Sequence, residues 1–377
     1  MEGTLEELQQ KSAYQGGRVG DFDSRQKGEK EAWDEFLANH AWGQHVQSSM
    51  WGDLKTLHGW QPHRIILKEN GRIVAGAQIL LRDISIIGKV GYISKGPVFA
   101  YAGLKLYRRF FNHLIRAAKA NKARLVLMQP VQNDARFLEF IHDEGLLESD
   151  FELAPRATVR VPLQPPIEDI LKGMKSHTRY QFRKGERRGL TARMAGKEEL
   201  KTFYRLLEQT ARRQDFSPYP LAYFEEMWGA FEKNGQIQLI FVDYENEPVC
   251  AQLMIAFGNT VVAKNCGWTG EHRKLSPMYF MDWESIKWAK ENGFAYYDFE
   301  GIKPEAAAEL KAGRPLPEKF HQTPTFYKLR FGGEVLLLPS AYEFVPNAFL
   351  RFCYKSLQPV LANSSLAIKL RRRFAQG

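Results

Sequence analysis

The sequence predicts an α/β protein made of two similar domains in tandem, each built on a mixed β-sheet. The first observation is an internal repeat. The run IILKENGRIVAGAQILL at 65–81 returns as LIFVDYENEPVCAQLMIAF at 239–257, with an Ala-Gln pair in matching places. The second is Ala-Lys-x-Asn before a strand-like run, at 118–121 and again at 289–292. The third is the order β-β-β-α-β in each half, which is typical of α/β domains.

Apolar spacings of three and four predict helices in the first half, and buried or alternating runs predict strands. One helix is expected to begin near Glu29 and a second to have Ser48 or Ser49 as its N-cap, and two more are expected at 104–119 and 137–144. A hairpin turns at Asn70-Gly71, because Asn-Gly is the strongest short turn signal. The remaining expected strands are 85–93, 124–128 and 157–163.

The second half is expected to repeat this order after the linker prolines that follow residue 163. The expected helices are 167–173, 200–213, 223–231 and 278–292. The expected strands are 238–244, 248–257, 260–266 and 295–299. We therefore predict a disordered tail at 1–28, a first domain at 29–164, a second at 165–345 and a basic amphipathic tail at 346–377.

Composition favours a cytoplasmic protein with an anionic partner. Lys plus Arg number 53 against 43 for Asp plus Glu, a net charge of +10, which suits RNA, phosphorylated metabolites or an anionic membrane face. Moderately basic enzymes are also common, so charge alone leaves the partner open. The N-terminus lacks the pattern of a signal peptide. The three cysteines form no metal motif, and we expect no metal or cofactor.

The basic excess is concentrated in two segments. In the first, 172–193, Lys172, Lys175, Arg179 and Arg183 recur at intervals of three and four, which would align them on one helical face for phosphate contacts. The alternative is a solvated face. The second segment, 351–373, is amphipathic and would suit the inner leaflet of a membrane. Its alternative is a terminal helix packed on the second domain.

Four stretches resemble one known family, the Fem-type (FemABX) aminoacyl-tRNA-dependent transferases that build peptidoglycan bridges. They are QSSMWGDLK with Gly59-Trp60, GYISKGPV at 91–98, the pair KSHTRYQFRKGERRGL with YYDFEGI, and FYKLRFGGE at 326–334. The resemblance runs from about Trp33 to Tyr342, and the chain is similar to the compact, FemX-like form of the family. It implies two domains like the acyl-CoA N-acyltransferase (GNAT) fold. Family members often carry an Asp after Gly-Pro-Val, where this chain has Ala100.

The implied reaction is aminolysis of an ester. A stem-peptide amine of a nucleotide-linked (UDP-linked) or lipid-linked muropeptide precursor would attack the carbonyl that joins an amino acid to tRNA. Such an activated ester requires positioning and oxyanion stabilisation rather than a nucleophilic side chain. Two alternatives remain: a GNAT-like N-acyltransferase that uses a CoA or carrier thioester, and a non-catalytic binder of RNA or anionic lipid. The oligomeric state is unknown.

Lys328, in FYKLRFGGE, is the expected catalytic residue, because a lysine among aromatics can meet a phosphate or an oxyanion. The alternative is a surface lysine on a strand, whose stem covers the aromatics. We expect Lys328→Ala to lower turnover far more than stability.

Other residues are candidates for substrate binding. The resemblance makes Lys55 a candidate for the precursor diphosphate, although an exposed helix lysine fits the sequence equally well. Asp298 and Glu300 end a predicted strand, where α/β sites often lie, but Asp298 would also suit a structural carboxylate. Tyr219 and Tyr223 are candidates to line the acceptor groove, and the alternative for both is packing. The other substrate-binding candidates are Arg212, on the preceding helix, and the basic-face residues Lys175, Arg179 and Arg183.

Overall fold

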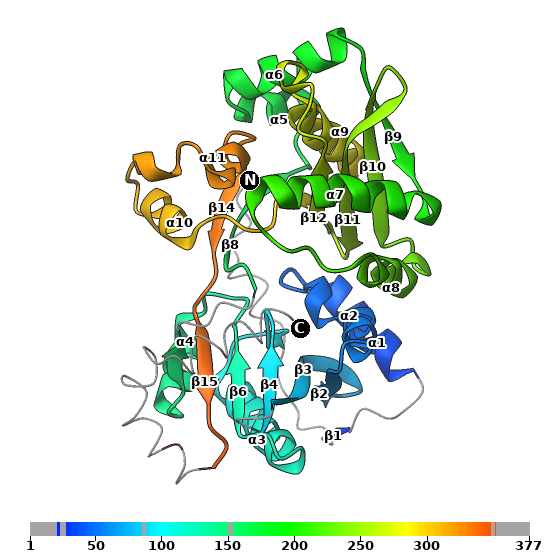
Figure 1. The fold of residues 1–377 in the computed structure, drawn as a ribbon. Coiled ribbons are helices and arrows are strands. Elements are labelled where there is room, and N and C mark those ends of the chain that lie inside the picture. The colour runs from blue at the N-terminus through cyan, green and yellow to red at the C-terminus, as the bar shows by residue number, and fades with distance from the viewer. Residues whose placement is uncertain (1–20, 23–27, 85–87, 150–153, 348–350, 352–377) are drawn as a thin grey trace.

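The computed structural model consists of two halves, each a β-sheet with helices packed against it (Figure 1). It describes residues 21–22, 28–84, 88–149, 154–347 and 351. The strand order of the first sheet is β1-β2-β3-β4-β6-β15-β7, with β5 paired to β3. The strand order of the second sheet is β14-β8-β13-β12-β11-β10-β9. Both sheets mix parallel and antiparallel pairs, which confirms the predicted α/β class with mixed sheets.

Within the described residues, the first half contains four α-helices and most of the first sheet. Its helices are α1 (Glu29–Ala38), the 3-10 helix η1 (His45–Gln47), α2 (Ser49–Thr56), α3 (Leu104–Ala120) and α4 (Ala135–Asp143). Its strands are β1 (Asp21–Phe22), β2 (Gln61–Glu69), β3 (Arg72–Ile84), β4 (Gly88–Ile93), β5 (Val98–Phe99), β6 (Leu125–Met128) and β7 (Leu147–Ser149).

The second half follows the same plan, with additional helices at its start and end. Its helices are α5 (Ile167–Gly173), α6 (Ser176–Arg187), η2 (Lys197–Glu199), α7 (Leu200–Gln214), α8 (Leu221–Glu232), η3 (Arg273–Leu275), α9 (Pro277–Glu291), α10 (Pro304–Lys311), η4 (Glu318–Phe320) and α11 (Pro324–Leu329). Its strands, with the returning β15, are β8 (Ala157–Pro162), β9 (Leu190–Ala195), β10 (Ile237–Tyr244), β11 (Glu247–Phe257), β12 (Thr260–Trp268), β13 (Tyr296–Asp298), β14 (Glu334–Leu337) and β15 (Ala341–Phe344).

The internal repeat is a structural repeat. In the first half β2, β3 and β4 pair antiparallel, α3 crosses over, and β6 pairs parallel to β4. In the second half β10, β11 and β12 pair antiparallel, α9 crosses over, and β13 pairs parallel to β12. The two hairpin turns also match, because Asn70-Gly71 and Glu245-Asn246 all have positive φ. Consecutive positive φ angles are required by the tight turns that match strand twist.

The sheets divide the chain differently from the expected boundary at 164/165. Strand β8, expected in the first domain, pairs with β13 and β14 in the second sheet. Strand β15, expected in the second domain, pairs with β6 and β7 in the first sheet. The chain therefore crosses between the halves twice. No local pattern predicts this exchange, because a short alternating strand fits either sheet.

The predicted tails fall mostly outside the described residues. Asp21 and Phe22 form a strand that pairs with Ile66 and Leu67 of β2, so the expectation of disorder across 1–28 is wrong at this point. The amphipathic part of the C-terminal tail lies outside the described residues, and Arg351, at its start, donates to the Glu144 carbonyl. None of the described helices combines the length and hydropathy needed to span a membrane.

One hydrophobic core joins the two halves. It includes Trp33 and Leu54 from the first half and Phe203, Phe224 and Phe231 from the second, all at most 1% exposed. Most of its second-half members lie on α7, α8, β10 and β11, while α2 packs directly on α8. A shared apolar core favours a fixed arrangement of the halves, since polar interfaces permit domain motion more readily. The boundary between them is therefore a suitable place for a preformed site.

Candidate functional site

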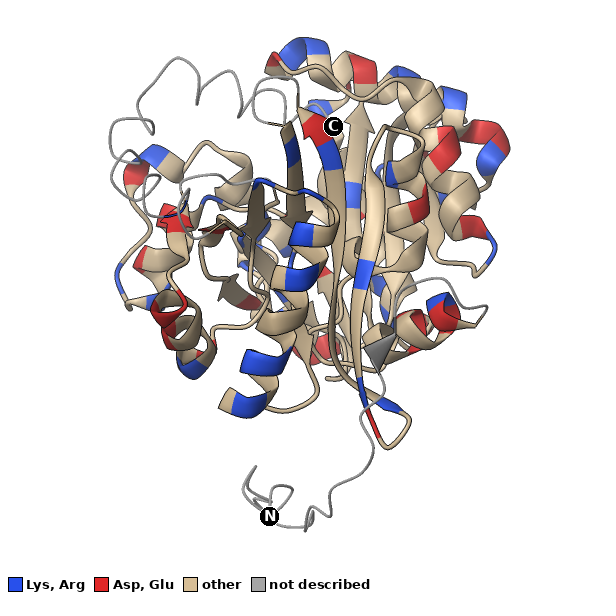
Figure 2. Ribbon diagram, turned by 90° about the horizontal axis from the view of Figure 1, so that it is seen from below, with Lys and Arg blue, Asp and Glu red and all other residues tan. Residues whose placement is uncertain are grey.

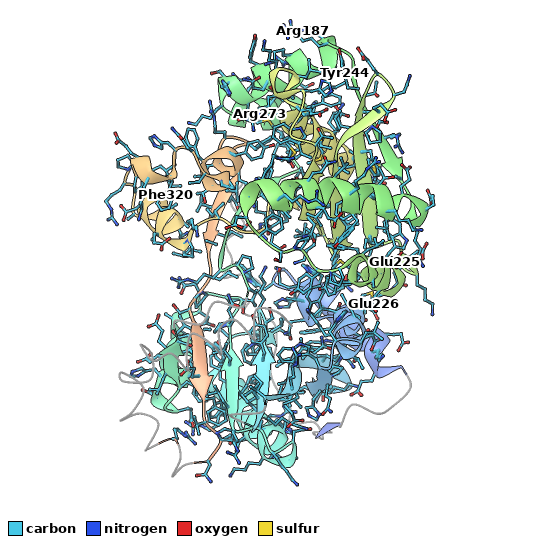
Figure 3. The ribbon with its side chains drawn as sticks, in the orientation of Figure 1. Arg187, Glu225, Glu226, Tyr244, Arg273 and Phe320 are labelled. Atoms are coloured by element: carbon cyan, nitrogen blue, oxygen red, sulfur yellow. The ribbon has the colours of Figure 1, made fainter. Side chains whose placement is uncertain are left out.

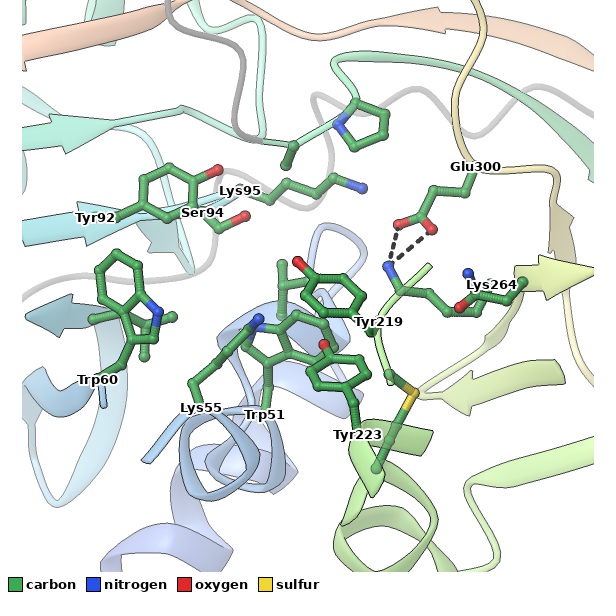
Figure 4. Close-up of a pocket in the computed structure, with 16 residues that line it drawn as sticks. Trp51, Lys55, Trp60, Tyr92, Ser94, Lys95, Tyr219, Tyr223, Lys264 and Glu300 are labelled. Atoms are coloured by element: carbon green, nitrogen blue, oxygen red, sulfur yellow. Dashed lines mark hydrogen bonds and ion pairs between the residues drawn. The ribbon is translucent and has the colours of Figure 1, made fainter. Parts of the chain in front are cut away.

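A cavity of about 290 Å³ lies between the two halves (Figure 4). The first half contributes α2, β4 and the turn after it, and the second contributes α8, β12 and the segment after β13. The lining residues are Val46, Trp51, Lys55, Trp60, Leu80, Tyr92, Ser94, Lys95, Ala154, Pro155, Tyr219, Tyr223, Met227, Lys264, Asn265 and Glu300. Aromatic and basic side chains dominate this list, and Glu300 is its single carboxylate.

The start of α2 is fixed by polar contacts, and this helix carries Lys55. Ser48 caps the helix and accepts a hydrogen bond from the Trp51 amide at 3.2 Å. Gln78 of β3, the glutamine of the repeat, donates to the Ser48 carbonyl at 2.8 Å. Capping satisfies amide groups that a helix start leaves without partners. The expected N-cap is therefore confirmed, and the glutamine of the repeat anchors the helix.

The Lys55 ammonium is enclosed by aromatic rings. Its Nζ lies 5.2 Å from the ring centres of Trp51 and Tyr223 and 5.6 Å from that of Tyr219. Tyr219 stacks on Tyr223 with ring centres 4.2 Å apart. Burial, helped by Lys264 and Arg82, lowers the pKa of Lys55 to about 8. The three candidates Lys55, Tyr219 and Tyr223 thus meet in one pocket.

Glu300 forms a buried ion pair with Lys264, and this pair faces Lys55 across the pocket (Figure 4). Both carboxylate oxygens of Glu300 accept from Lys264 Nζ at 2.9 Å. Burial by itself raises the pKa of Glu300, but Lys264, Lys95 and His45 outweigh it and hold the pKa at about 2. Glu300 is therefore ionised at neutral pH and is a weak proton acceptor. It can hold cations and position their charge.

Lys328 lies behind this pair and is not one of the lining residues. Its Nζ donates to the backbone carbonyls of Glu300 at 2.6 Å and Gly301 at 2.8 Å. It belongs to α11, a short helix, rather than to the strand assumed in the alternative interpretation. Burial lowers the pKa of Lys328. In this arrangement Lys328 fixes the backbone that presents Glu300, so the expected direct contact with an oxyanion has no geometry here to support it.

Asp298 has the contacts of a structural carboxylate. Its Oδ1 accepts from Thr158 Oγ1 at 2.5 Å and from the Glu300 amide at 2.8 Å. These contacts tie β8 to the turn after β13. Asp298 does not line the pocket that contains Lys55, which favours the structural interpretation of this residue.

The expected basic face does not form as one ridge. Lys172 belongs to α5 and Lys175 is the N-cap of α6, so the helix break at 174–175 separates Lys172 from Arg179 and Arg183. Arg179 Nη1 donates to the carbonyls of Leu171 and Met174 and thereby closes this break. Basic residues at intervals of three and four align on one face only if the helix is continuous. The backbone at 174–175 is extended, so the helix is interrupted there.

The helix α6 also lies away from the pocket. Figure 3 shows Arg187, the last residue of α6, at the far end of the second half, whereas Glu226 of α8 lies at the boundary between the halves. Glu226 pairs there with His58 of the first half at 2.7 Å. Arg212 is exposed near the end of α7 and does not line the pocket. Basic residues are spread over both halves (Figure 2).

The sequence analysis missed several lining residues, including Trp60, Lys95 and Lys264. Trp60 and Lys95 lie within the quoted motifs but received no role. Lys264 had one available signal, because it is a lone charged residue inside the otherwise apolar and polar-neutral strand TVVAKNCGW. A charge in a central strand has to be paired, and its partner Glu300 was among the candidates. No three His, Cys, Asp or Glu side chains of the described part of the chain form a metal-binding group.

Comparison with known proteins finds a match in each half of the chain. Residues 29–139 match the sequence profile of the FemAB family, and residues 173–309 match that of an acetyltransferase (GNAT) domain. The Lipid II:glycine glycyltransferase of Staphylococcus saprophyticus subsp. saprophyticus is 29% identical over 236 residues, which are 59% of this chain and 56% of the relative. The chain thus spans about half the length of the curated relatives it matches.

Two solved structures share the fold. FemX superposes with a TM-score of 0.77 at 19% identity, covering 89% of this chain and 99% of FemX. A tandem GNAT protein from the clavulanic acid biosynthesis pathway superposes with a TM-score of 0.50 at 11% identity, covering 88% and 98% of the two chains. Together with the repeated strand order, these matches define a protein with two GNAT-like domains in tandem. Within that class, the profile match and the glycyltransferase relative make the chain similar to the Fem-type family, in agreement with the resemblance of its motifs.

Proposed function

We propose that the protein is an aminoacyltransferase that moves an amino acid from aminoacyl-tRNA to a stem-peptide amine of a peptidoglycan precursor. The observation that carries this proposal is the preformed pocket between the halves, with its aromatic-packed Lys55 and the buried Lys264–Glu300 pair. The glycyltransferase named for its action on Lipid II supports a lipid-linked precursor as acceptor. The protein would act in the cytoplasm, in peripheral contact with the inner face of the membrane.

The reaction joins the acceptor nitrogen to the ester carbonyl carbon and breaks the bond from that carbon to the tRNA ribose oxygen. The ribose oxygen leaves with one proton, and the second proton released by the ammonium passes to solvent. The rate then depends on holding two anionic reactants in contact. Cationic side chains in a partly dehydrated pocket stabilise bound anions more strongly than they would in water. Lys55 would bind a phosphate group, and Tyr219 and Tyr223 would pack on the precursor.

The donor is tested by supplying charged tRNA, acyl-CoA or neither to the purified protein, with a lipid-linked precursor and, in parallel, a nucleotide-linked precursor as acceptor. Mass spectrometry of the precursor should show the mass of an added aminoacyl group only in the reaction with charged tRNA. A product formed only with acyl-CoA would reject the proposal in favour of a GNAT-like N-acyltransferase. If neither donor gives product while the precursor still binds, the protein is a binder rather than an enzyme.

A further inference from the structure

Three charged residues of the pocket have an irregular backbone conformation. Lys95 and Glu300 are non-glycine residues with φ of 48° and 37°. Lys264 is the extra residue of a bulge in β12, because Leu253 pairs with Asn265 whereas the next residue, Met254, pairs with Ala263. Left-handed non-glycine residues cost on the order of 1–3 kcal/mol and persist where surrounding contacts hold them. Bulges are found next to functional sites, where they re-aim a side chain.

The conformation of Glu300 is held from several directions. Asp298 accepts a hydrogen bond from its amide at 2.8 Å. Lys328 donates to its carbonyl at 2.6 Å and to that of Gly301 at 2.8 Å. Its carboxylate accepts from Lys264 through both oxygens. Because backbone and side chain are both fixed, Glu300 sets the place of the Lys264 ammonium.

The pocket has more positive than negative groups. Its charged lining residues are Lys55, Lys95, Lys264 and Glu300. The Lys95 side chain extends toward the side of the pocket where Lys264 and Glu300 meet (Figure 4), and only 7% of Lys95 is exposed. Among the described residues, Lys95 has no carboxylate as an ion-pair partner. A buried ammonium group without such a partner favours an anionic ligand.

The two ammonium groups retain hydrogen-bonding capacity. An ammonium group has three N–H donors, and Glu300 takes two of those of Lys264. Lys95 also lines a second, smaller cavity together with Arg156, Arg160 and Asp298, so it stands where the two spaces adjoin. A ligand that enters the larger pocket would meet both ammonium groups beside Glu300.

We propose that Lys95 and Lys264 form an oxyanion-binding subsite of the pocket, with Glu300 as a positioning residue. The subsite takes a phosphate or carboxylate group of the substrate on the side of the pocket opposite Lys55. This assignment rests on the proposed function for the substrate that carries the anion. The binding itself depends only on the chemistry of the pocket.

The subsite is tested by isothermal titration of the full chain, without tRNA, against two probes. Inorganic diphosphate represents phosphate ligands, and a dipeptide with a free carboxylate represents peptide ligands. At least one probe should bind, and Lys95→Met and Lys264→Met should each weaken it at least ~tenfold, equivalent to ~1.4 kcal/mol. Lys30→Met, at a half-exposed lysine of α1, is the charge-matched control and should leave binding unchanged. Wild-type protein that binds neither probe at millimolar concentration would overturn the subsite.

Two further variants separate ligand contact from folding and from general electrostatics. Lys264→Met leaves the Glu300 carboxylate without its partner, so the double variant Lys264→Met/Glu300→Gln restores neutrality. It should fold like the wild type and still bind weakly, and binding at wild-type strength would overturn the role of Lys264. Glu300→Gln alone should weaken binding although it removes a negative charge. Tighter binding would show that Glu300 only opposes anions, and would overturn its positioning role.

The outcomes for the subsite and for the proposed function are distinguishable. Probe binding that depends on Lys95 and Lys264, without aminoacyl transfer, keeps the subsite and rejects the transferase. Aminoacyl transfer with wild-type KM in both lysine variants keeps the transferase and rejects the subsite.

Discussion

Replacing Lys328 by methionine should reduce both the stability and the turnover of this protein. The side chain donates to the carbonyls of Glu300 and Gly301 from a partly buried position. Methionine keeps much of the volume but leaves two carbonyls without their donor. The contacts therefore change the expectation from the sequence, in which turnover would fall far more than stability.

The magnitude follows from the two lost hydrogen bonds. Hydrogen bonds to a charged group contribute ~1.5–3 kcal/mol each, and partial exposure lets water replace some of this, so we expect a loss of ~3 kcal/mol. Unfolding entropy near ~2.1 cal/mol/K per residue gives ~0.8 kcal/mol/K for a chain of 377 residues. The melting temperature should then fall by ~4 °C. Displacement of Glu300 by ~1 Å could cost ~100-fold in turnover.

Scanning calorimetry and the tRNA-dependent mass assay measure the two effects. Lys290→Met is the matched control, because Lys290 Nζ also donates to two carbonyls, those of Leu163 and Pro165, both at 2.7 Å. Lys290 does not line the pocket, so its variant should lose some stability and keep its turnover. An unchanged melting temperature for Lys328→Met together with abolished turnover would refute the reasoning and restore a direct role for Lys328.

Three other predictions follow from single contacts. Binding of the anionic precursor should weaken as pH rises through about 8, where Lys55 loses its proton, and calorimetry should find this step absent in Lys55→Met. The pKa of Glu300 is lowered to about 2, so its ionised form stabilises the fold at pH values above its ordinary pKa of ~4.3. As the pH falls from ~4.3 toward 2, the difference in unfolding free energy between wild type and Glu300→Gln should shrink. A difference that stays constant with pH would contradict this. Gly267→Ala should cost ~1–3 kcal/mol in urea unfolding, because its Cβ would lie 2.4 Å from the Leu207 nitrogen, whereas Gly229→Ala, with nothing within 4 Å, should be neutral or stabilising.

Much of the fold could be predicted from the sequence because its signals are local. The periodicity of 167–173 and the Asn70-Gly71 turn report directly on neighbouring residues, and both predictions are confirmed. The internal repeat predicted the matching strand order of the two halves. The exchange of β8 and β15 between the sheets was missed, because strand partners distant in sequence leave no local signal.

The candidate site could be predicted only in part, because local motifs identify single residues but not the contacts between distant ones. Lys55, Tyr219, Tyr223 and Glu300 were named separately and meet in one pocket. Spacing misled the prediction at Arg179, whose guanidinium closes a helix break instead of facing a ligand. Lys264 was missed because its orientation comes from a strand bulge, and a bulge depends on the register between two strands.

The central claim is that the pocket between the halves holds the precursor, and a crystal structure with a bound nucleotide-linked precursor tests it most directly. We expect electron density for the ligand between α2 and the turn at Glu300, with its anionic groups within hydrogen-bond distance of Lys55 or of Lys95 and Lys264. Ligand density at α6, against Arg179 and Arg183, with an empty pocket between the halves would contradict it.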